Sequence, residues 1–159
     1  MATLGDVMAY LCERYPHKHE LSKARLAKLI YLADWKSAIE RGEQMTGTVW
    51  FYNYFGPYVD DVAIEAEKDP AFKVRGIRNL YGDPKELIEL VRPRKYPSLT
   101  EDDKRILDSV IASAARKNWN DFIRLVYSTY PIITQDRFSQ LDLAELARRY
   151  AEDQAALRT

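Results

Sequence analysis

The sequence has almost no cysteine, no excess charge of either sign and no long apolar run. Cys12 is the only cysteine, which excludes an internal disulfide and a cysteine-rich zinc site and favours a reducing compartment, by default the cytoplasm. The 24 basic and 24 acidic residues cancel, so no global field favours nucleic acid or an acidic membrane surface. The sequence shows neither an apolar run long enough to cross a bilayer nor a secretory leader, so we expect neither membrane insertion nor secretion.

The local signatures of catalysis are also missing. The six glycines are scattered as turn and stop residues and form no phosphate-binding loop, nucleophile elbow or dinucleotide fingerprint. His17, His19 and Glu20, with Cys12 one helix away, are the set that invites a metal-dependent hydrolase. Structural zinc requires four converging ligands, and a solvated polar loop explains these residues better. We therefore expect no catalytic residues, no metal and no cofactor.

The residues that are present fit one globular domain over residues 1–159. A chain with 47% apolar and 30% charged residues is long enough to bury one core. The expected fold is mainly α (α+β), a compact multi-helix domain with a small β-hairpin or short sheet inserted between its N-terminal and C-terminal helices. The tail beyond Asp153 should fray. Capping residues and helical spacing predict helices from Thr3 to Tyr15, from Ser22 to about Arg41, from Asp60 to Lys68, from Thr100 to about Lys117, from Asn120 to near Tyr127, and from Asp142 onwards.

Six aromatic rings crowd the segment VWFYNYFGPYV, residues 49–59, which contains a Gly-Pro pair. Its aromatic and β-branched residues predict a short strand or an extended loop. One side of that chain should plug the core, while the other needs cover from the C-terminal helices or from a protein partner. Pro57 is expected in the first turn of the following helix. Alternation places Trp50, Tyr52 and Tyr54 on one side and Val49, Phe51 and Phe55 mainly on the other.

Residues 72–93 hold two runs around a turn at Gly82, Asp83 and Pro84, which predicts a hairpin, although residues 85–90 also fit a helical turn. Basic side chains on or beside this hairpin could track a nucleic-acid strand next to exposed rings. Acidic residues interleave with them, so a solvated strand face is the favoured interpretation. The basic residues are Lys73, Arg75, Arg78, Arg92, Arg94 and Lys95, and the acidic ones Asp83, Glu86 and Glu89.

The run from Leu21 to Val59 resembles the signature of the SocA-like, or Panacea, antitoxin domain family. In that family a helix of the form Leu-x-Lys-Leu-Leu-Tyr precedes an aromatic-rich segment that ends on Gly-Pro. The chain departs from the family at Tyr58, where many members have valine, and at residues 127–132, YSTYPI, where many have histidine before Pro-Trp. The matching residues are Leu26, Lys28, Leu29, Ile30 and Tyr31 in the helix, and Trp50, Tyr54, Gly56 and Pro57 in the aromatic segment.

The resemblance implies an α-rich antitoxin of a bacterial or phage toxin–antitoxin system that neutralises a cognate toxin by direct protein contact, without catalysis. The alternatives are a proteolytic adaptor that delivers the toxin to a protease, and a nucleic-acid-binding regulator that uses residues 73–95. Either a homo-oligomer or a toxin–antitoxin hetero-oligomer is compatible with these functions. The hypothesised partner-binding residues are Tyr52, Tyr54, Tyr58, Arg75 and Arg78.

Two residues carry specific mechanistic predictions. Lys28 lies within the most apolar helix, so its ammonium is predicted to reach a carboxylate or the carbonyls near Gly56 and to anchor the aromatic segment. Tyr52, or failing that Tyr58, is predicted to be the exposed anchor of the partner-facing surface.

Overall fold

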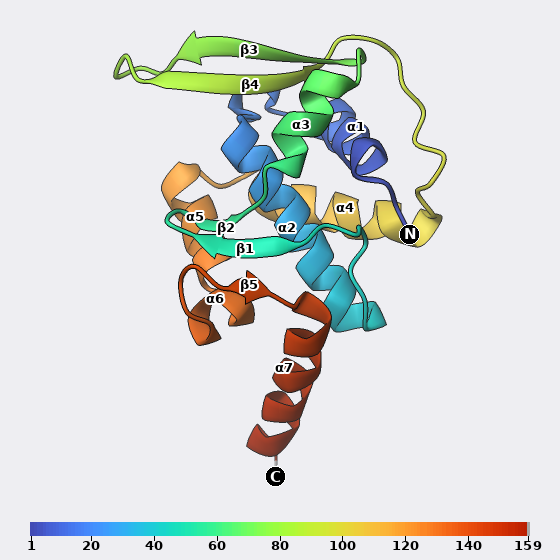
Figure 1. Cartoon of the computed structure of the whole chain (residues 1–159), viewed down its shortest axis with the longest axis vertical. Helices are drawn as coiled ribbons and strands as arrows, with labels where there is room; N and C mark the ends of the chain where they lie inside the picture. Colours follow the sequence, from blue (N-terminus) through green and yellow to red (C-terminus); the bar gives the residue numbers. More distant parts are fainter. Residues whose placement is uncertain (159) are drawn as a thin grey trace.

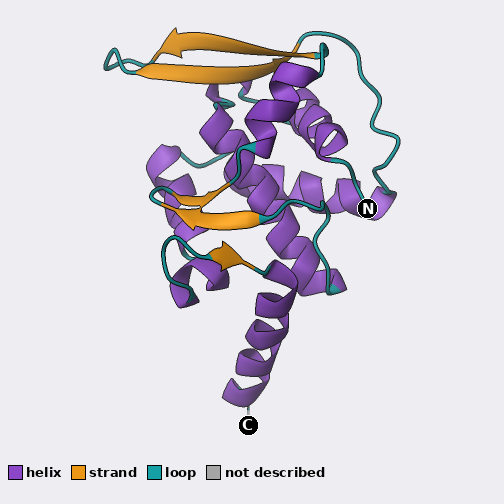
Figure 2. Ribbon diagram, viewed as in Figure 1, coloured by secondary structure: helices purple, strands orange, loops and turns teal. Residues whose placement is uncertain are grey.

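The computed structural model describes residues 1–158, and within them helices dominate and two small antiparallel sheets lie between the N-terminal and C-terminal helices (Figures 1 and 2). The mainly α (α+β) prediction is therefore confirmed. The helices are α1 (Leu4–Arg14), the short 3-10 helix η1 (Lys18–Glu20), α2 (Lys23–Arg41), α3 (Asp61–Lys68), α4 (Glu101–Ala114), α5 (Trp119–Tyr127), α6 (Tyr130–Thr134) and α7 (Leu143–Leu157). The strands are β1 (Trp50–Asn53), β2 (Gly56–Tyr58), β3 (Phe72–Arg78), β4 (Pro84–Leu90) and β5 (Gln140–Leu141).

Helix α2 forms the centre of the molecule, where it runs behind the three-stranded sheet and contacts α1, α3, α4 and α7 (Figure 1). Its side chains are buried around most of its circumference, as their apolar pattern predicts. The Ser22 hydroxyl caps it by accepting a hydrogen bond from Arg25 N at 3.1 Å. Gly42 ends it in the left-handed conformation, with φ of +79°. These local signals fix where the central helix begins and ends.

The two sheets occupy separate places in the molecule (Figure 2). The three-stranded sheet has the order β2-β1-β5, and β1 is antiparallel to both neighbours, with Phe51 opposite Tyr58 and Trp50 opposite Leu141. The β3–β4 hairpin forms the second sheet at one end of the molecule, so the predicted hairpin is confirmed and residues 85–90 form a strand.

Three sequence-based expectations about local structure are wrong. Pro57 lies in β2 opposite Tyr52 instead of starting a helix, because an edge strand tolerates a residue without an N–H group. Asn118, not Asn120, caps α5, because its side chain accepts a hydrogen bond from Asp121 N at 2.8 Å. The tail beyond Asp153 is not frayed, because helix α7 extends to Leu157.

A contact with α6 holds the C-terminal half of helix α7. The Tyr130 hydroxyl donates a hydrogen bond to Asp153 Oδ2 at 2.6 Å. Tyr130 itself lies at the start of α6. The contact between these two helices therefore extends the ordered structure towards the C-terminal end.

Candidate functional site

Exposed apolar side chains gather around the three-stranded sheet, and we call this set the aromatic face. Strand β1 alternates between inside and outside, so Trp50 and Tyr52 enter the core while Phe51 remains 47% exposed. Exposure rises to 67% at Tyr54 and 81% at Phe55. A sheet with one buried side thus presents large rings on the other. The aromatic face consists of Val49, Phe51, Tyr54, Phe55, Tyr58 and Phe138.

A tight turn displays the two most exposed rings of this face. Asn53 pairs with Gly56, so Tyr54 and Phe55 form the tip between β1 and β2. Gly56 has a φ of +95°, which strains any residue with a Cβ atom, and an added Cβ would also contact the Tyr127 ring at 3.5 Å. The Gly-Pro pair therefore sets the turn, and the turn directs both rings outwards.

Phe138, in the loop before β5, adds a ring from a distant part of the chain. It has a φ of +67°, an uncommon conformation for a bulky residue. Its backbone N–H donates to Tyr52 O at 2.6 Å, and its ring meets that of Tyr54 edge to face, with centroids 4.8 Å apart. Phe138 thus extends the surface that begins at Tyr54.

A shallow groove of about 600 Å³ crosses the aromatic face beside the start of α3. Phe51, Tyr58 and Phe138 line it, together with the carboxylates Asp60 and Asp61. The Tyr58 hydroxyl donates to Asp60 Oδ1 at 2.8 Å, and this hydrogen bond raises the pKa of the tyrosine. The groove therefore combines apolar walls with an acidic rim, which suits an apolar segment that carries a positive charge.

A buried carboxylate beneath the sheet holds the aromatic face in place. Asp34, on α2, has no exposed surface, and it accepts hydrogen bonds from Trp50 Nε1 at 2.9 Å, Thr46 N at 2.9 Å and Thr46 Oγ1 at 2.7 Å. Burial raises the pKa of Asp34 to about 6, and the hydrogen bonds from Thr46 and Trp50 oppose that rise. At pH 7 the group is thus mainly ionised and can accept from all three donors.

Sequence reasoning missed the role of Asp34. The available signal was a single acidic residue between Ala33 and Trp35 in a helix with apolar residues all round, since a buried charge requires partners. Gln44 strengthens the same network, because its amide donates to Thr46 O at 3.0 Å and Thr48 O at 2.8 Å. The loop before β1 is thereby fastened to α2.

The structure separates the predicted partner-binding residues into three environments. Tyr52 is only 9% exposed, so its prediction as an exposed anchor is wrong. It lies on the inner side of β1 with Trp50, and the Arg137 guanidinium carbon is 5.6 Å from its ring centroid. Tyr54 and Tyr58 lie on the aromatic face. Arg75 and Arg78 lie on β3 in the other sheet, where Arg75 Nε is 3.3 Å from Glu89 Oε1 and Arg78 Nη1 donates to Gly82 O at 2.8 Å.

Most residues that match the family signature are buried in the core. Leu26, Leu29, Tyr31 and Trp50 are all fully buried. The Tyr31 and Trp50 rings meet edge to face with centroids 5.6 Å apart. The signature helix and the aromatic segment therefore meet inside the core, and the exposed rings of the segment remain free for contact.

Lys28 does not form the predicted anchor. It is only 3% exposed and its ammonium makes no hydrogen bond or ion pair with any residue in 1–158; because no fully buried side-chain nitrogen in that range lacks a partner, the ammonium keeps some contact with solvent. Burial lowers the pKa of Lys28 to about 8. Asp34, through Trp50 and Thr46, supplies the connection that the sequence assigned to Lys28.

Neither a metal-binding cluster nor a membrane-spanning helix is found within residues 1–158. Within residues 1–158, no group of histidine, cysteine, aspartate and glutamate side chains converges to hold a metal ion. Cys12 is buried and points its thiol at Ile88 O, whereas His19 is largely exposed. None of the helices in this part of the chain is both long and apolar enough to span a membrane.

One comparison with known proteins gave a match. A family model described as "Antitoxin SocA-like, Panacea domain" matches residues 26–131, which is more than half of the chain. The comparisons with curated proteins and with solved structures found no match. The matched range contains most of α2, both strands β1 and β2, and the β3–β4 hairpin.

Proposed function

Because the chain belongs to the SocA-like Panacea domain family of antitoxins, we propose that it neutralises a cognate protein toxin by direct contact through the aromatic face, without catalysis. An antitoxin role in general follows from the family. The contact surface and the non-enzymatic mechanism are our proposal, and they rest on the geometry of the described residues.

The observation that carries the proposal is the display of large rings on a firmly held sheet. Phe51, Tyr54 and Phe55 are between 47% and 81% exposed, while Trp50 in the same strand is fully buried and bonded to Asp34. Large exposed apolar patches on folded proteins usually mark interaction sites. Rings on a pre-organised surface lose little conformational entropy on binding, so they serve well as interface anchors.

The chemistry of the groove narrows the part of the toxin that would bind. Asp60 and Asp61 lie at its edge, and apolar side chains form its walls. A segment with an apolar residue beside a lysine or arginine would satisfy both features. Neutralisation then consists of covering that segment of the toxin.

We expect a small toxin-like reading frame beside this gene, and the first experiment is co-expression with it. We expect the antitoxin to restore growth, to co-purify with the toxin and to leave the amount of toxin unchanged on an immunoblot. Growth rescue with no complex would contradict the contact mechanism. A fall in toxin level that depends on a host protease would favour an adaptor instead.

A matched pair of variants localises the contact. Phe55→Ser removes an exposed ring of the aromatic face, whereas Leu80→Ser removes a fully exposed side chain from the tip of the β3–β4 hairpin. Only Phe55→Ser is expected to weaken the complex. Equal weakening by both changes would contradict the assignment to this face.

A further inference from the structure

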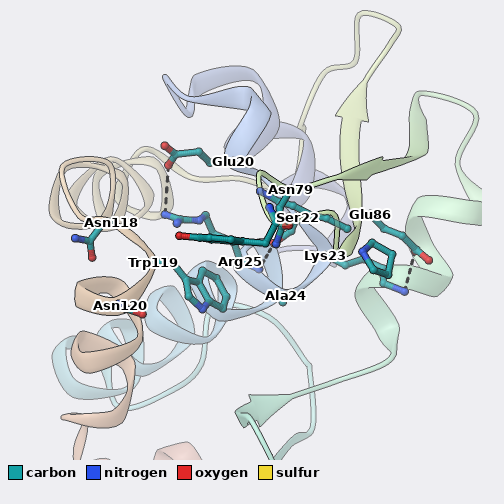
Figure 3. Close-up of a pocket in the computed structure, with 13 residues that line it drawn as sticks. Glu20, Ser22, Lys23, Ala24, Arg25, Asn79, Glu86, Asn118, Trp119 and Asn120 are labelled. Carbon is teal, nitrogen blue, oxygen red and sulfur yellow. Dashed lines mark hydrogen bonds and ion pairs between the residues drawn. The ribbon is translucent and has the colours of Figure 1, made fainter.

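A second concave site lies on a different part of the molecule. A groove of about 810 Å³ is bounded by the β3–β4 hairpin, the start of α2 and the start of α5 (Figure 3). It shares no lining residue with the groove on the aromatic face. Its volume is within the range of sites for small organic ligands.

A buried guanidinium lines this groove. Arg25 is 4% exposed, its Nη1 donates to the Tyr15 hydroxyl at 3.1 Å, and the same atom lies 3.6 Å from Glu20 Oε2 (Figure 3). Nε and Nη2 have no hydrogen-bond partner within residues 1–158, yet no fully buried side-chain nitrogen in that range lacks one. Both nitrogens therefore keep some exposed surface, and because Arg25 lines the groove they can present a planar pair of donors to it, the arrangement that binds phosphate or carboxylate oxygens.

Two helices also begin at this groove. Ser22 caps α2, a helix of 19 residues, and Asn118 caps α5, a helix of nine residues, and both caps line the groove. Each helix start carries partial positive charge on its free N–H groups. The Asn118 side-chain oxygen accepts from Asp121 N, so its amide NH₂ group remains available to a ligand. The helix starts and the buried guanidinium are independent features that favour an anion at the same place.

The ionic groups around the groove leave one basic side chain without a counter-ion. Glu20 lies beside Arg25, and Glu86 Oε2 is 3.1 Å from Lys23 Nζ. Lys85 lines the groove as well and forms no ion pair within residues 1–158. The lining side chains therefore carry a net positive charge of one, which adds to the field of the two helix starts.

Aromatic side chains occupy the same groove. Trp119 is 42% exposed, and the Arg25 guanidinium carbon lies 5.4 Å from its ring centroid. Figure 3 shows the Trp119 indole beside Arg25, near the start of α5. Tyr81, which is 89% exposed, lines the groove from the hairpin. A planar ring of a ligand could stack on these side chains while its anionic group meets Arg25.

We propose that this groove binds a nucleoside phosphate. The phosphate lies against the open edge of Arg25 and the first turns of α2 and α5, with Lys85 as a further cation. The base stacks on Trp119, and Tyr81 covers it from the hairpin. An acidic peptide would supply the charge but not the planar ring, so the exposed indole beside the guanidinium favours a nucleotide.

Calorimetric titration of the purified full chain tests the proposal with ATP, adenosine, inorganic tripolyphosphate and an octaglutamate peptide as probes. We expect ATP to bind more tightly than each of the other three. Proximity of Trp119, the most exposed of the three tryptophans, also predicts a change in indole fluorescence on ATP binding. Absence of ATP binding at millimolar concentration would overturn the proposal. So would adenosine, tripolyphosphate or octaglutamate binding as tightly as ATP.

Variants test which residues contact the base and which contact the phosphate. Trp119→Ala is expected to weaken ATP binding by about tenfold, the contribution of one stacked base, while Trp119→Phe keeps most of the affinity. Arg25→Lys should also weaken binding, because an ammonium cannot replace the planar fork. Lys85→Ala, at a partly exposed position, tests the phosphate end without disturbing the core and is expected to weaken ATP but not adenosine.

Leu80→Ser, on the same hairpin but outside the groove lining, is the matched control and should bind ATP as the unchanged chain does. If Trp119→Ala or Lys85→Ala binds ATP with unchanged affinity, the groove is not the site.

Discussion

The two sheets of this protein differ in what they show to solvent. The β2-β1-β5 sheet exposes rings, and its inner side is tied to α2 by the buried network around Asp34. The β3–β4 hairpin exposes charges of both signs, and Arg75 is paired there with Glu89 across the strands. Surface ion pairs stay solvated, whereas exposed rings gain free energy when a partner covers them. The comparison supports our proposal that the aromatic face is the contact surface for the toxin, whereas the part of the second sheet that carries Arg75 and Glu89 is an ordinary solvated surface.

The largest expected effect comes from removing the carboxylate that holds the first sheet. In Asp34→Ala, the Trp50 indole and both Thr46 donors lose their acceptor while remaining buried, and each such loss costs about 1–3 kcal/mol. We expect the free energy of unfolding to fall by about 3 kcal/mol or more in urea denaturation. Asp34→Asn, which keeps one acceptor, should lose less. A change below about 1 kcal/mol for Asp34→Ala would show that the network is not what holds the aromatic face.

Replacement of Lys28 is expected to have the opposite effect and to stabilise the fold. Lys28→Met is expected to raise the free energy of unfolding at pH 7 by up to roughly 3 kcal/mol, because it removes a largely buried charge whose pKa is lowered by desolvation and keeps the side-chain volume. If Lys28 anchored the aromatic segment, this variant would instead have a lower free energy of unfolding.

The pH dependence of this gain has a definite sign. The pKa of Lys28 is about 8 in the folded chain and 10.5 as its ordinary value. Between these values the unfolded state binds more protons, so the stability of the original chain rises as the pH increases. The advantage of Lys28→Met should therefore shrink above pH 8 and vanish near pH 10.5. Urea denaturation at pH 7 and pH 10 checks this, and a destabilised variant at pH 7 would reveal a favourable partner for the ammonium.

Each sheet contains a glycine, and the pair provides a controlled comparison of backbone strain. Gly56 has a φ of +95° and lies near Tyr127, so Gly56→Ala should lower the free energy of unfolding by about 1–2 kcal/mol. Gly76 in β3 has no positive φ and open space around it, so Gly76→Ala should change stability by less than about 0.5 kcal/mol. Equal effects in thermal denaturation would mean that the Gly-Pro turn is not conformationally demanding.

The smallest effect is expected at the surface ion pair of the hairpin. Arg75→Ala should change the free energy of unfolding by no more than about 0.5 kcal/mol, because Arg75 is more than half exposed and exposed pairs contribute little. Urea denaturation at low and high salt measures this. A loss of 2 kcal/mol or more would mean that the hairpin is held by its charges, which would remove the contrast between the two sheets.

Local signals in the sequence predicted much of the fold. Thr3, Ser22, Thr100 and Asp142 all act as the helix caps that their spacing indicates. The hairpin around Gly82 was also predictable, since turn residues separate its two strands. Caps and turns depend on neighbours within a few residues, so a single sequence contains the information they need.

The candidate site could not be predicted in the same way, because it is formed by long-range contacts that sequence spacing does not reveal. Alternation placed Tyr52 correctly on the same side as Trp50 but placed Tyr54 wrongly, because β1 ends at Asn53 and Tyr54 lies in the turn, 67% exposed. The Arg137 side chain that lies over the Tyr52 ring comes from a distant part of the chain. The role of Asp34 likewise depends on a loop that folds back onto α2. Long-range packing decides which ring is covered and which carboxylate is buried, and one sequence does not specify it.

The binding affinity of two double variants for the cognate toxin tests the central contrast most directly. Tyr54→Ser with Phe55→Ser removes two rings of the aromatic face, and Arg75→Ser with Arg78→Ser removes two charges of the hairpin; all four side chains are substantially exposed, so both proteins should fold. The account predicts at least about tenfold weaker toxin binding for the first protein. It predicts nearly unchanged binding for the second. Unchanged binding by the aromatic variant, or loss of binding by the hairpin variant alone, would contradict it.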